Sequence, residues 1–185
     1  MNVWLVTLGS SDVQLKDADV WGEWYPEIKR SLYGIDRTND DDDVPYRIAA
    51  RVLGIAYEKL GKAVTEQLAF PLLEQFQRQL LDKAETIDRI VVLTSDQSNV
   101  FGEDEQESYG CPYWQDTCLL YPIVSDYLQS LFPAAHISQL SLLPALDQGL
   151  DDWDAVLKLV RREIASLDFE PEKVYVSHQA GTPAI

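Results

Sequence analysis

Basic residues are scarce in this sequence. The chain has 15 lysines and arginines against 31 aspartates and glutamates, a formal net charge of −16 over 185 residues. No Lys or Arg occurs from position 90 to position 157. Duplex DNA and anionic membranes repel such a chain at long range, which excludes a protein that coats nucleic acid through a broad basic face. Binding of a small anion in a shielded pocket stays compatible with this charge.

Long apolar runs and metal-binding patterns are also missing. No apolar run reaches the roughly 18 residues that a membrane helix needs. The first eight residues lack a basic leader and are typical of a strand, so no signal peptide is expected. The two cysteines, Cys111 and Cys118, lack CxxC spacing and have no histidine nearby, so we expect reduced thiols rather than a zinc site. These absences predict a cytoplasmic protein with no membrane segment, metal or cofactor.

Three common catalytic or nucleotide-binding motifs are absent. The sequence contains no GxGxxG dinucleotide fingerprint, no GxxxxGK[ST] P-loop and no GxSxG nucleophile elbow. Ser10, Asp12 and His178 supply the residue types of a hydrolase triad. Polar loops supply such sets by chance, however, and a triad is defined by geometry that a sequence does not show.

Short β-branched segments alternate with helical periodicity along the chain. The segments that predict strands are 3–8, 87–94, 136–142 and 173–177. Apolar residues spaced three and four apart predict helices over 48–60, 72–80, 119–131 and 153–167. Such alternation favours parallel pairing through right-handed crossovers. The predicted fold is therefore α/β, a Rossmann-like three-layer sandwich with a mainly parallel central sheet. Two acidic stretches, 36–43 and 102–108, are expected to be solvated surface, and the second is alternatively a lid.

Three of the predicted strands end in loops rich in hydroxyl and amide side chains, and ligands of open parallel sheets collect beyond these strand ends. The candidate ligand-binding residues are Gly9, Ser10, Ser11, Asp12 and Gln14 in the first loop, Thr94, Ser95, Asp96 and Gln97 in the second, and Ser177, His178, Gln179, Ala180, Gly181 and Thr182 in the third. None of these loops contains Lys or Arg, so a phosphate would be held by backbone N–H groups and hydroxyls. Thr182 is a candidate helix cap. Asp96 and Gln97 suit adenine edges or ribose hydroxyls, and Asp96 alternatively serves as a turn residue.

Four segments of the chain resemble a known family. They are Gly9-Ser10-Ser11-Asp12-Val13-Gln14-Leu15, Thr94-Ser95-Asp96-Gln97, Asp116-Thr117-Cys118-Leu119-Leu120-Tyr121-Pro122-Ile123 and Tyr175-Val176-Ser177-His178-Gln179-Ala180-Gly181-Thr182-Pro183-Ala184-Ile185. Together they make essentially the whole chain similar to a CARF domain, the CRISPR-associated Rossmann fold. The terminal Gly-Thr-Pro-Ala loop is the most specific of these segments.

The resemblance implies a function in type III CRISPR antiviral defence. CARF domains form homodimers and bind cyclic oligoadenylates, here a tetra- or hexa-adenylate, and many control a fused effector nuclease allosterically. The ring lies across the two-fold axis, on the loops after the first and last strands. The resemblance therefore implies a single CARF-like domain over residues 1–185, followed by a further helix and an effector domain.

Two alternatives stay open. Some CARF domains are metal-independent ring nucleases, in which the ribose 2′-OH attacks its own phosphate and leaves a 2′,3′-cyclic phosphate. Ser11, Ser10 and His178 are the candidate catalytic residues for that reaction. Many ring nucleases of the family place a lysine in the pocket, and the last loop of this chain has none. The second alternative is a nucleotide-binding Rossmann module unrelated to CRISPR.

Overall fold

The computed structural model describes residues 1–32, 48–108, 110–146 and 148–177. Its centre is a four-stranded sheet in the order β5-β4-β1-β6, in which every neighbouring pair of strands is parallel. The strands are β1 (Asn2–Thr7), β4 (Arg89–Ser95), β5 (His136–Leu142) and β6 (Lys173–Ser177). The four predicted strands and the predicted α/β fold class are confirmed; the ends of β1 and β4 are shifted by one or two residues, and β5 and β6 have the predicted bounds.

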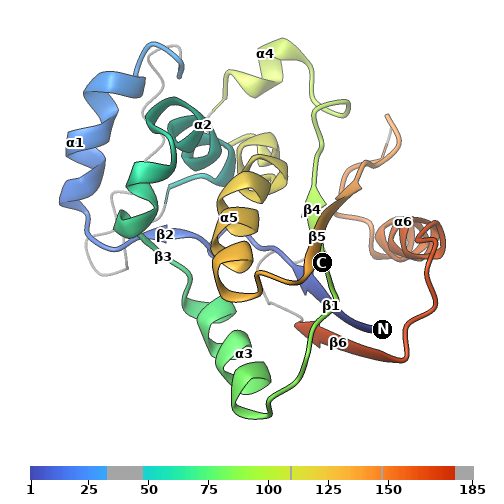
Figure 1. Cartoon of the computed structure of the whole chain (residues 1–185). Helices are drawn as coiled ribbons and strands as arrows, with labels where there is room; N and C mark the ends of the chain where they lie inside the picture. Colours follow the sequence, from blue (N-terminus) through green and yellow to red (C-terminus); the bar gives the residue numbers. More distant parts are fainter. Residues whose placement is uncertain (33–47, 109, 147, 178–185) are drawn as a thin grey trace.

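Helices lie on both faces of this sheet (Figure 1). One face carries α1 (Asp19–Ile28), α2 (Ala50–Leu60), α3 (Pro71–Asp82) and α5 (Tyr121–Leu131). The other face carries α6 (Trp153–Ala165). Parallel strands covered on both faces need apolar residues on both sides, which explains the nearly continuous apolar run of β4.

Several smaller elements did not follow from the hydrophobic pattern. They are α1, α4 (Glu103–Gln106), the antiparallel pair β2 (Gln14–Leu15) and β3 (Leu68–Ala69), and three 3₁₀ segments, η1 (Lys62–Gln67), η2 (Pro112–Gln115) and η3 (Cys118–Leu120). Helix α4 falls inside the second acidic stretch, where three acidic residues occupy its first turn. Negative charge there is favourable because the N-terminus of a helix carries a partial positive charge.

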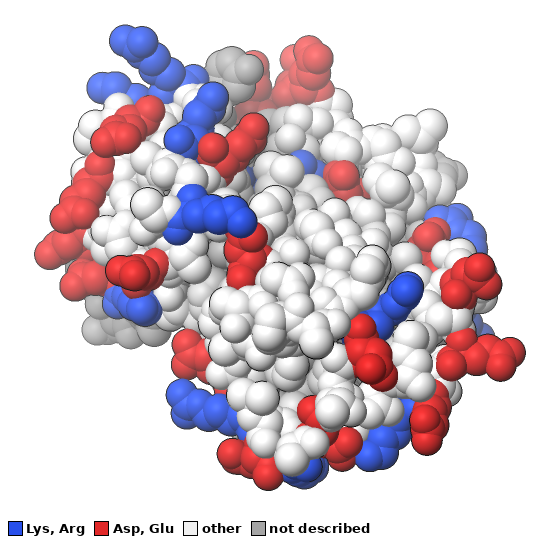
Figure 2. All heavy atoms as spheres, viewed as in Figure 1, with Lys and Arg blue, Asp and Glu red and all other residues white. Residues whose placement is uncertain are grey.

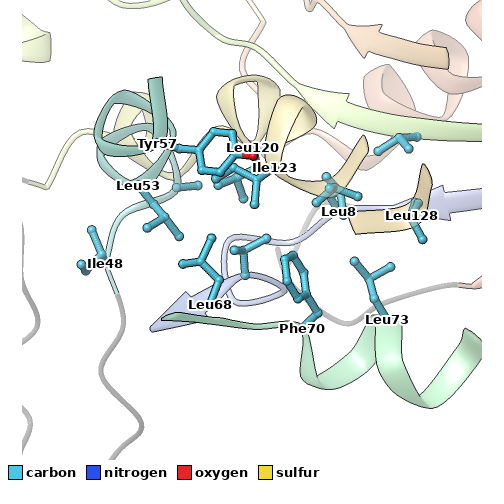
Figure 3. Packing of buried hydrophobic residues seen from close by; sticks show 14 of the residues in the cluster. Leu8, Ile48, Leu53, Tyr57, Leu68, Phe70, Leu73, Leu120, Ile123 and Leu128 are labelled. Atoms are coloured by element: carbon cyan, nitrogen blue, oxygen red, sulfur yellow. The ribbon is translucent and has the colours of Figure 1, made fainter. Parts of the chain in front are cut away.

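The main core lies between the sheet and the four helices α1, α2, α3 and α5. Leu53 of α2, Leu120 of η3 and Ile123 of α5 are almost completely buried and belong to the same cluster (Figure 3). Gly54 allows this close packing, because a Cβ at that position would lie 2.5 Å from the Leu119 carbonyl oxygen. The contact between α2 and η3 therefore depends on a residue without a side chain.

The face that carries α6 has smaller apolar clusters. One joins Val3, Val91, Leu93 and Leu140 to side chains that follow α6, and another packs α6 against Leu142 and Leu150. On the edge strand β6, Val174 is 46% exposed and Val176 is 59% exposed. The two faces of the sheet are therefore covered unequally.

The order of the strands defines where a ligand site is expected. The chain passes from β1 to β4 to β5 in one direction and then crosses back over β1 to β6. Crossovers of one hand in opposite directions place their helices on opposite faces, as seen for α5 and α6. The direction reverses between β1 and β6, so the topological switch point lies at the carboxyl ends of these two strands.

Charge is distributed without a basic patch on the face seen in Figure 2, where acidic and basic side chains alternate around an uncharged surface over α5. In the four ranges that the structure describes, no helix has the length and apolar character needed to cross a membrane.

Candidate functional site

The carboxyl ends of β1, β4 and β6 bring the first two predicted loops and Ser177 to one edge of the sheet. Thr7 of β1 pairs with Leu93 of β4, and Val6 pairs with Ser177 of β6. The Leu8 N–H continues the ladder by donating to the Leu93 carbonyl at 3.1 Å. The loop after β1 therefore lies between the loop after β4 and the end of β6. Five predicted residues of the third loop, His178, Gln179, Ala180, Gly181 and Thr182, lie outside the described residues.

The loop after β1 is closed by Asp12. Its carboxylate is fully buried and accepts the Gly9 N–H at 2.5 Å, while the Asp12 N–H donates to the Gly9 carbonyl at 3.1 Å. Burial raises the pKa of Asp12 to about 6, and the hydrogen bond from Gly9 opposes this rise. The Gln14 amide donates to the Ser11 carbonyl at 2.7 Å. Asp12 and Gln14 thus fix the shape of this loop.

Ser10 and Ser11 are the accessible side chains of the same loop. Both are partly exposed. Neither hydroxyl forms a hydrogen bond with another residue of the described part of the chain. A serine hydroxyl donates one hydrogen bond and accepts two, so this pair has unused capacity for a phosphate or a ribose.

Two predicted residues of the second loop are buried and bonded within the protein. Thr94 is 1% exposed, and its hydroxyl accepts from the Gln139 amide at 2.9 Å. Ser95 and Thr117 exchange hydrogen bonds, because the N–H of each residue donates to the other's hydroxyl at 3.0 and 3.2 Å. These hydroxyls join β4 to its neighbours and leave little surface for a ligand.

Gln97 is similarly occupied. Its backbone N–H and its side-chain amide both donate to Asp116, at 2.7 and 3.0 Å, and its side-chain oxygen accepts the Leu150 N–H at 3.0 Å. Ser177 at the end of β6 has no exposed surface and accepts from the Trp4 indole N–H at 3.1 Å. Of the predicted polar residues that the structure describes at this edge, Ser10, Ser11 and Asp96 combine exposed surface with a position at the loop tips.

The structure adds a basic residue that the loop sequences do not contain. Arg51, the second residue of α2, is 5% exposed and is the only buried Lys or Arg in the described part of the chain. Its Nη2 donates to Asp96 at 2.5 Å and to Asp116 at 3.1 Å, and its Nε donates to the Tyr113 carbonyl at 2.7 Å. The guanidinium also stacks on the Tyr113 ring, 3.9 Å from its centroid. A sequence signal existed, because position 51 lies three residues after Ile48 and four before Ile55, on the apolar side of the predicted helix.

The carboxylates around Arg51 differ in exposure. The Asp116 side chain is 1% exposed and the Asp96 side chain is 24% exposed. Burial opposes ionisation of Asp96, but hydrogen bonds from Ser98 and Arg51 outweigh it and hold the pKa of Asp96 below its ordinary value. Two carboxylates against one guanidinium leave one net negative charge at the end of β4. This end of the site therefore favours ligand groups that donate hydrogen bonds over anions.

The same region offers little for metal or thiol chemistry. In the described ranges, no three His, Cys, Asp or Glu side chains lie close enough to hold a metal ion. Cys111 and Cys118 are both free thiols. Burial raises the pKa of Cys118 to about 11, against an opposing effect of Arg51, so this thiol stays protonated near neutral pH.

The fold defines a Rossmann-like α/β protein, and its topological switch point lies between β1 and β6. Searches with family models, curated proteins and solved structures found no match to this chain. The comparisons thus leave the particular family open, and the fold and the edge residues carry the functional argument.

Proposed function

We propose that this chain is a cyclic oligoadenylate-binding sensor domain of type III CRISPR defence, which acts as a homodimer and controls an effector nuclease allosterically. The observation that carries the proposal is the adjacency of β1 and β6 at the switch point, which places the Gly9–Ser11 loop beside the end of β6. The ligand of the resembled family binds the loops after the first and last strands. The resemblance and the topology thus point to the same edge.

The chemistry of the accessible groups suits this ligand. A cyclic oligoadenylate presents phosphodiester oxygens, ribose hydroxyls and adenine edges in a compact ring. Ser10 and Ser11 can donate to phosphate oxygens, as can the N–H groups of a glycine-containing loop. A two-fold axis would allow one set of loops to serve both halves of an even-numbered ring. The net charge of −16 is compatible with a small ring held by such neutral donors.

The test is a binding measurement with labelled cyclic tetra-adenylate and cyclic hexa-adenylate in the absence of metal. We expect one ring to bind, and the linear oligoadenylate of the same length to bind more weakly. Ser11→Ala should reduce the affinity for the ring. Ser130→Ala is the matched control, because Ser130 lies on α5 and its hydroxyl donates to the Tyr127 carbonyl. Failure of both rings to bind would contradict the proposal.

A ring nuclease is the second candidate, favoured by the unused hydroxyls of Ser10 and Ser11. In that reaction the 2′-oxygen bonds to phosphorus and the bond to the 5′-oxygen breaks. The proton of the 2′-OH is removed and the 5′-oxygen gains one, which yields a 2′,3′-cyclic phosphate and a 5′-OH. The protein's part is to hold the in-line geometry and to stabilise the phosphoryl oxygens. Linear products in the same assay would support this candidate, and their absence with full binding would support a sensor.

The third possibility, a nucleotide-binding module unrelated to CRISPR, predicts a different outcome of that assay. Such a module would bind a mononucleotide and neither ring. Adenosine monophosphate added as a competitor therefore separates it from the first two candidates.

A further inference from the structure

Asp96 has a different environment from the other candidates of its loop. Its backbone N–H donates to the Leu142 carbonyl at 3.1 Å, which fixes the residue at the end of the β4–β5 ladder. Thr94, Ser95 and Gln97 are each 7% exposed or less, whereas the Asp96 side chain is 24% exposed. Because β1 and β4 are neighbouring parallel strands, Asp96 and the loop that carries Ser10 and Ser11 follow them at the same edge of the sheet.

Two groups hold the Asp96 carboxylate in one orientation. Its Oδ1 accepts both the Arg51 Nη2 at 2.5 Å and the Ser98 N–H at 3.1 Å. Arg51 is itself fixed by Asp116 and by the carbonyl and ring of Tyr113. Since its guanidinium is already shared between two carboxylates, a ligand phosphate gains little from it. The exposed group of the Arg51–Asp96–Asp116 cluster is the Asp96 carboxylate, which accepts hydrogen bonds.

We propose that Asp96 accepts a hydrogen bond from a ribose hydroxyl of the bound nucleotide, and that Arg51 is the positioning residue that orients this carboxylate. The inference rests on the proposed function. A carboxylate accepts hydrogen bonds and repels phosphate, so among the groups of a ribonucleotide it pairs with a hydroxyl or the adenine amine. If the Ser10–Ser11 loop holds a phosphate, the ribose attached to that phosphate is the ligand group with the shortest reach to Asp96. Acidic residues at neighbouring strand ends bind ribose hydroxyls in dinucleotide-binding folds.

The consequence is selection of RNA over DNA. A ring of 2′-deoxyadenosines would leave the Asp96 carboxylate desolvated and without its donor. A hydrogen bond to a charged group contributes about 1.5–3 kcal/mol. This corresponds to a preference of roughly 10- to 150-fold for the ribose ring.

The experiment measures the affinities of the wild-type chain for whichever cyclic oligoadenylate it binds and for the all-2′-deoxy ring of the same size. The same two affinities are then measured for Asp96→Asn and for a control, Asp126→Asn. Asp126 is a fair match because its side chain is 30% exposed and pairs with Lys62 at 2.6 Å, away from the strand ends. We expect Asp96→Asn to weaken binding of the ribose ring by at least 10-fold and to leave the deoxy ring nearly unchanged. Asp126→Asn should keep the wild-type ratio.

Arg51→Lys tests the positioning role. This substitution keeps the positive charge and removes the planar guanidinium with its paired N–H donors. The ribose-to-deoxy ratio should fall several-fold, whereas a purely structural role would lower both affinities equally and leave the ratio unchanged. Equal wild-type affinity for both rings, or an unchanged ratio in Asp96→Asn, would overturn the inference and leave the proposed function standing. If neither ring bound, both the inference about Asp96 and the proposed function would be overturned. The wild-type ratio needs no variant, so the inference remains testable even if a substitution prevents folding.

Discussion

Replacement of Arg51 by methionine is the sharpest perturbation of the charge cluster. Methionine keeps an unbranched chain that can fill the space over the Tyr113 ring, but it removes the guanidinium. Asp116 would then retain its hydrogen bonds from Gln97 and lose its only cation within 4 Å among the described residues. A carboxylate with 1% of its side chain exposed cannot recover this interaction from water.

The magnitude follows from this geometry. The Arg51 Nη2 and the Asp116 Oδ2 are 3.1 Å apart. Unit charges at that separation attract by about 5 kcal/mol at an effective dielectric constant of about 20. Removal of one partner of a buried pair typically costs about 3–5 kcal/mol. The Asp96 pair adds less, because water reaches that carboxylate. We therefore expect Arg51→Met to lower the free energy of unfolding by about 4 kcal/mol.

Urea unfolding followed by circular dichroism and tryptophan fluorescence is the appropriate assay. The control is Arg78→Met, since Arg78 pairs with Glu74 across 3.5 Å on an exposed surface and should cost less than about 1 kcal/mol. A loss below about 1 kcal/mol in Arg51→Met, or a loss no larger than that of Arg78→Met, would refute this account of the cluster.

Three further predictions concern the core, the first loop and the ligand. Asp12 has a pKa of about 6 in the folded protein against an ordinary value of 3.8, so the folded state favours the protonated acid. The protonated Asp12 therefore contributes its full stabilisation below about pH 4, and this stabilisation is lost as the pH rises through 6. Asp12→Asn should therefore exceed the wild type in unfolding free energy by about 3 kcal/mol at pH 7.5 and by little at pH 3.5, and parallel curves of stability against pH would contradict this. Gly54→Ala should lower stability by about 1–3 kcal/mol because the new Cβ overlaps Leu119, and an unchanged melting temperature would contradict that packing. Affinity for the ring should depend only weakly on salt, because neutral donors hold the phosphates, and a steep salt dependence would show that basic residues reach the site.

The strands and the longest helices were accessible from the sequence because each carries its own periodicity. Strand β4 follows from its short, nearly continuous apolar run, and α6 follows from apolar residues spaced three and four apart. The antiparallel pair β2–β3 was not accessible, since two-residue strands leave no measurable pattern. Helix α1 was missed for another reason, because Pro26 and Gly22 interrupt it and weaken its helical signal.

The common position of the first two loops was predicted, whereas their internal contacts were not. Both loops follow strands β1 and β4, and neighbouring parallel strands end at the same edge of a sheet. Their internal hydrogen bonds could not be predicted, since Gln97 and Asp116 are 19 residues apart and Arg51 and Asp116 are 65 apart. Residue type alone does not distinguish a buried amide such as that of Gln97 from an accessible hydroxyl such as that of Ser11. That distinction comes from burial.

The central claim is the proposal that the sheet edge beyond the carboxyl ends of β1 and β6 binds a cyclic oligoadenylate across a dimer axis. The most direct test is a titration of the protein with cyclic tetra-adenylate and cyclic hexa-adenylate that reports both affinity and stoichiometry. The account predicts saturable binding of one ring per two chains. Binding of neither ring, or binding of one ring to each separate chain, would contradict it.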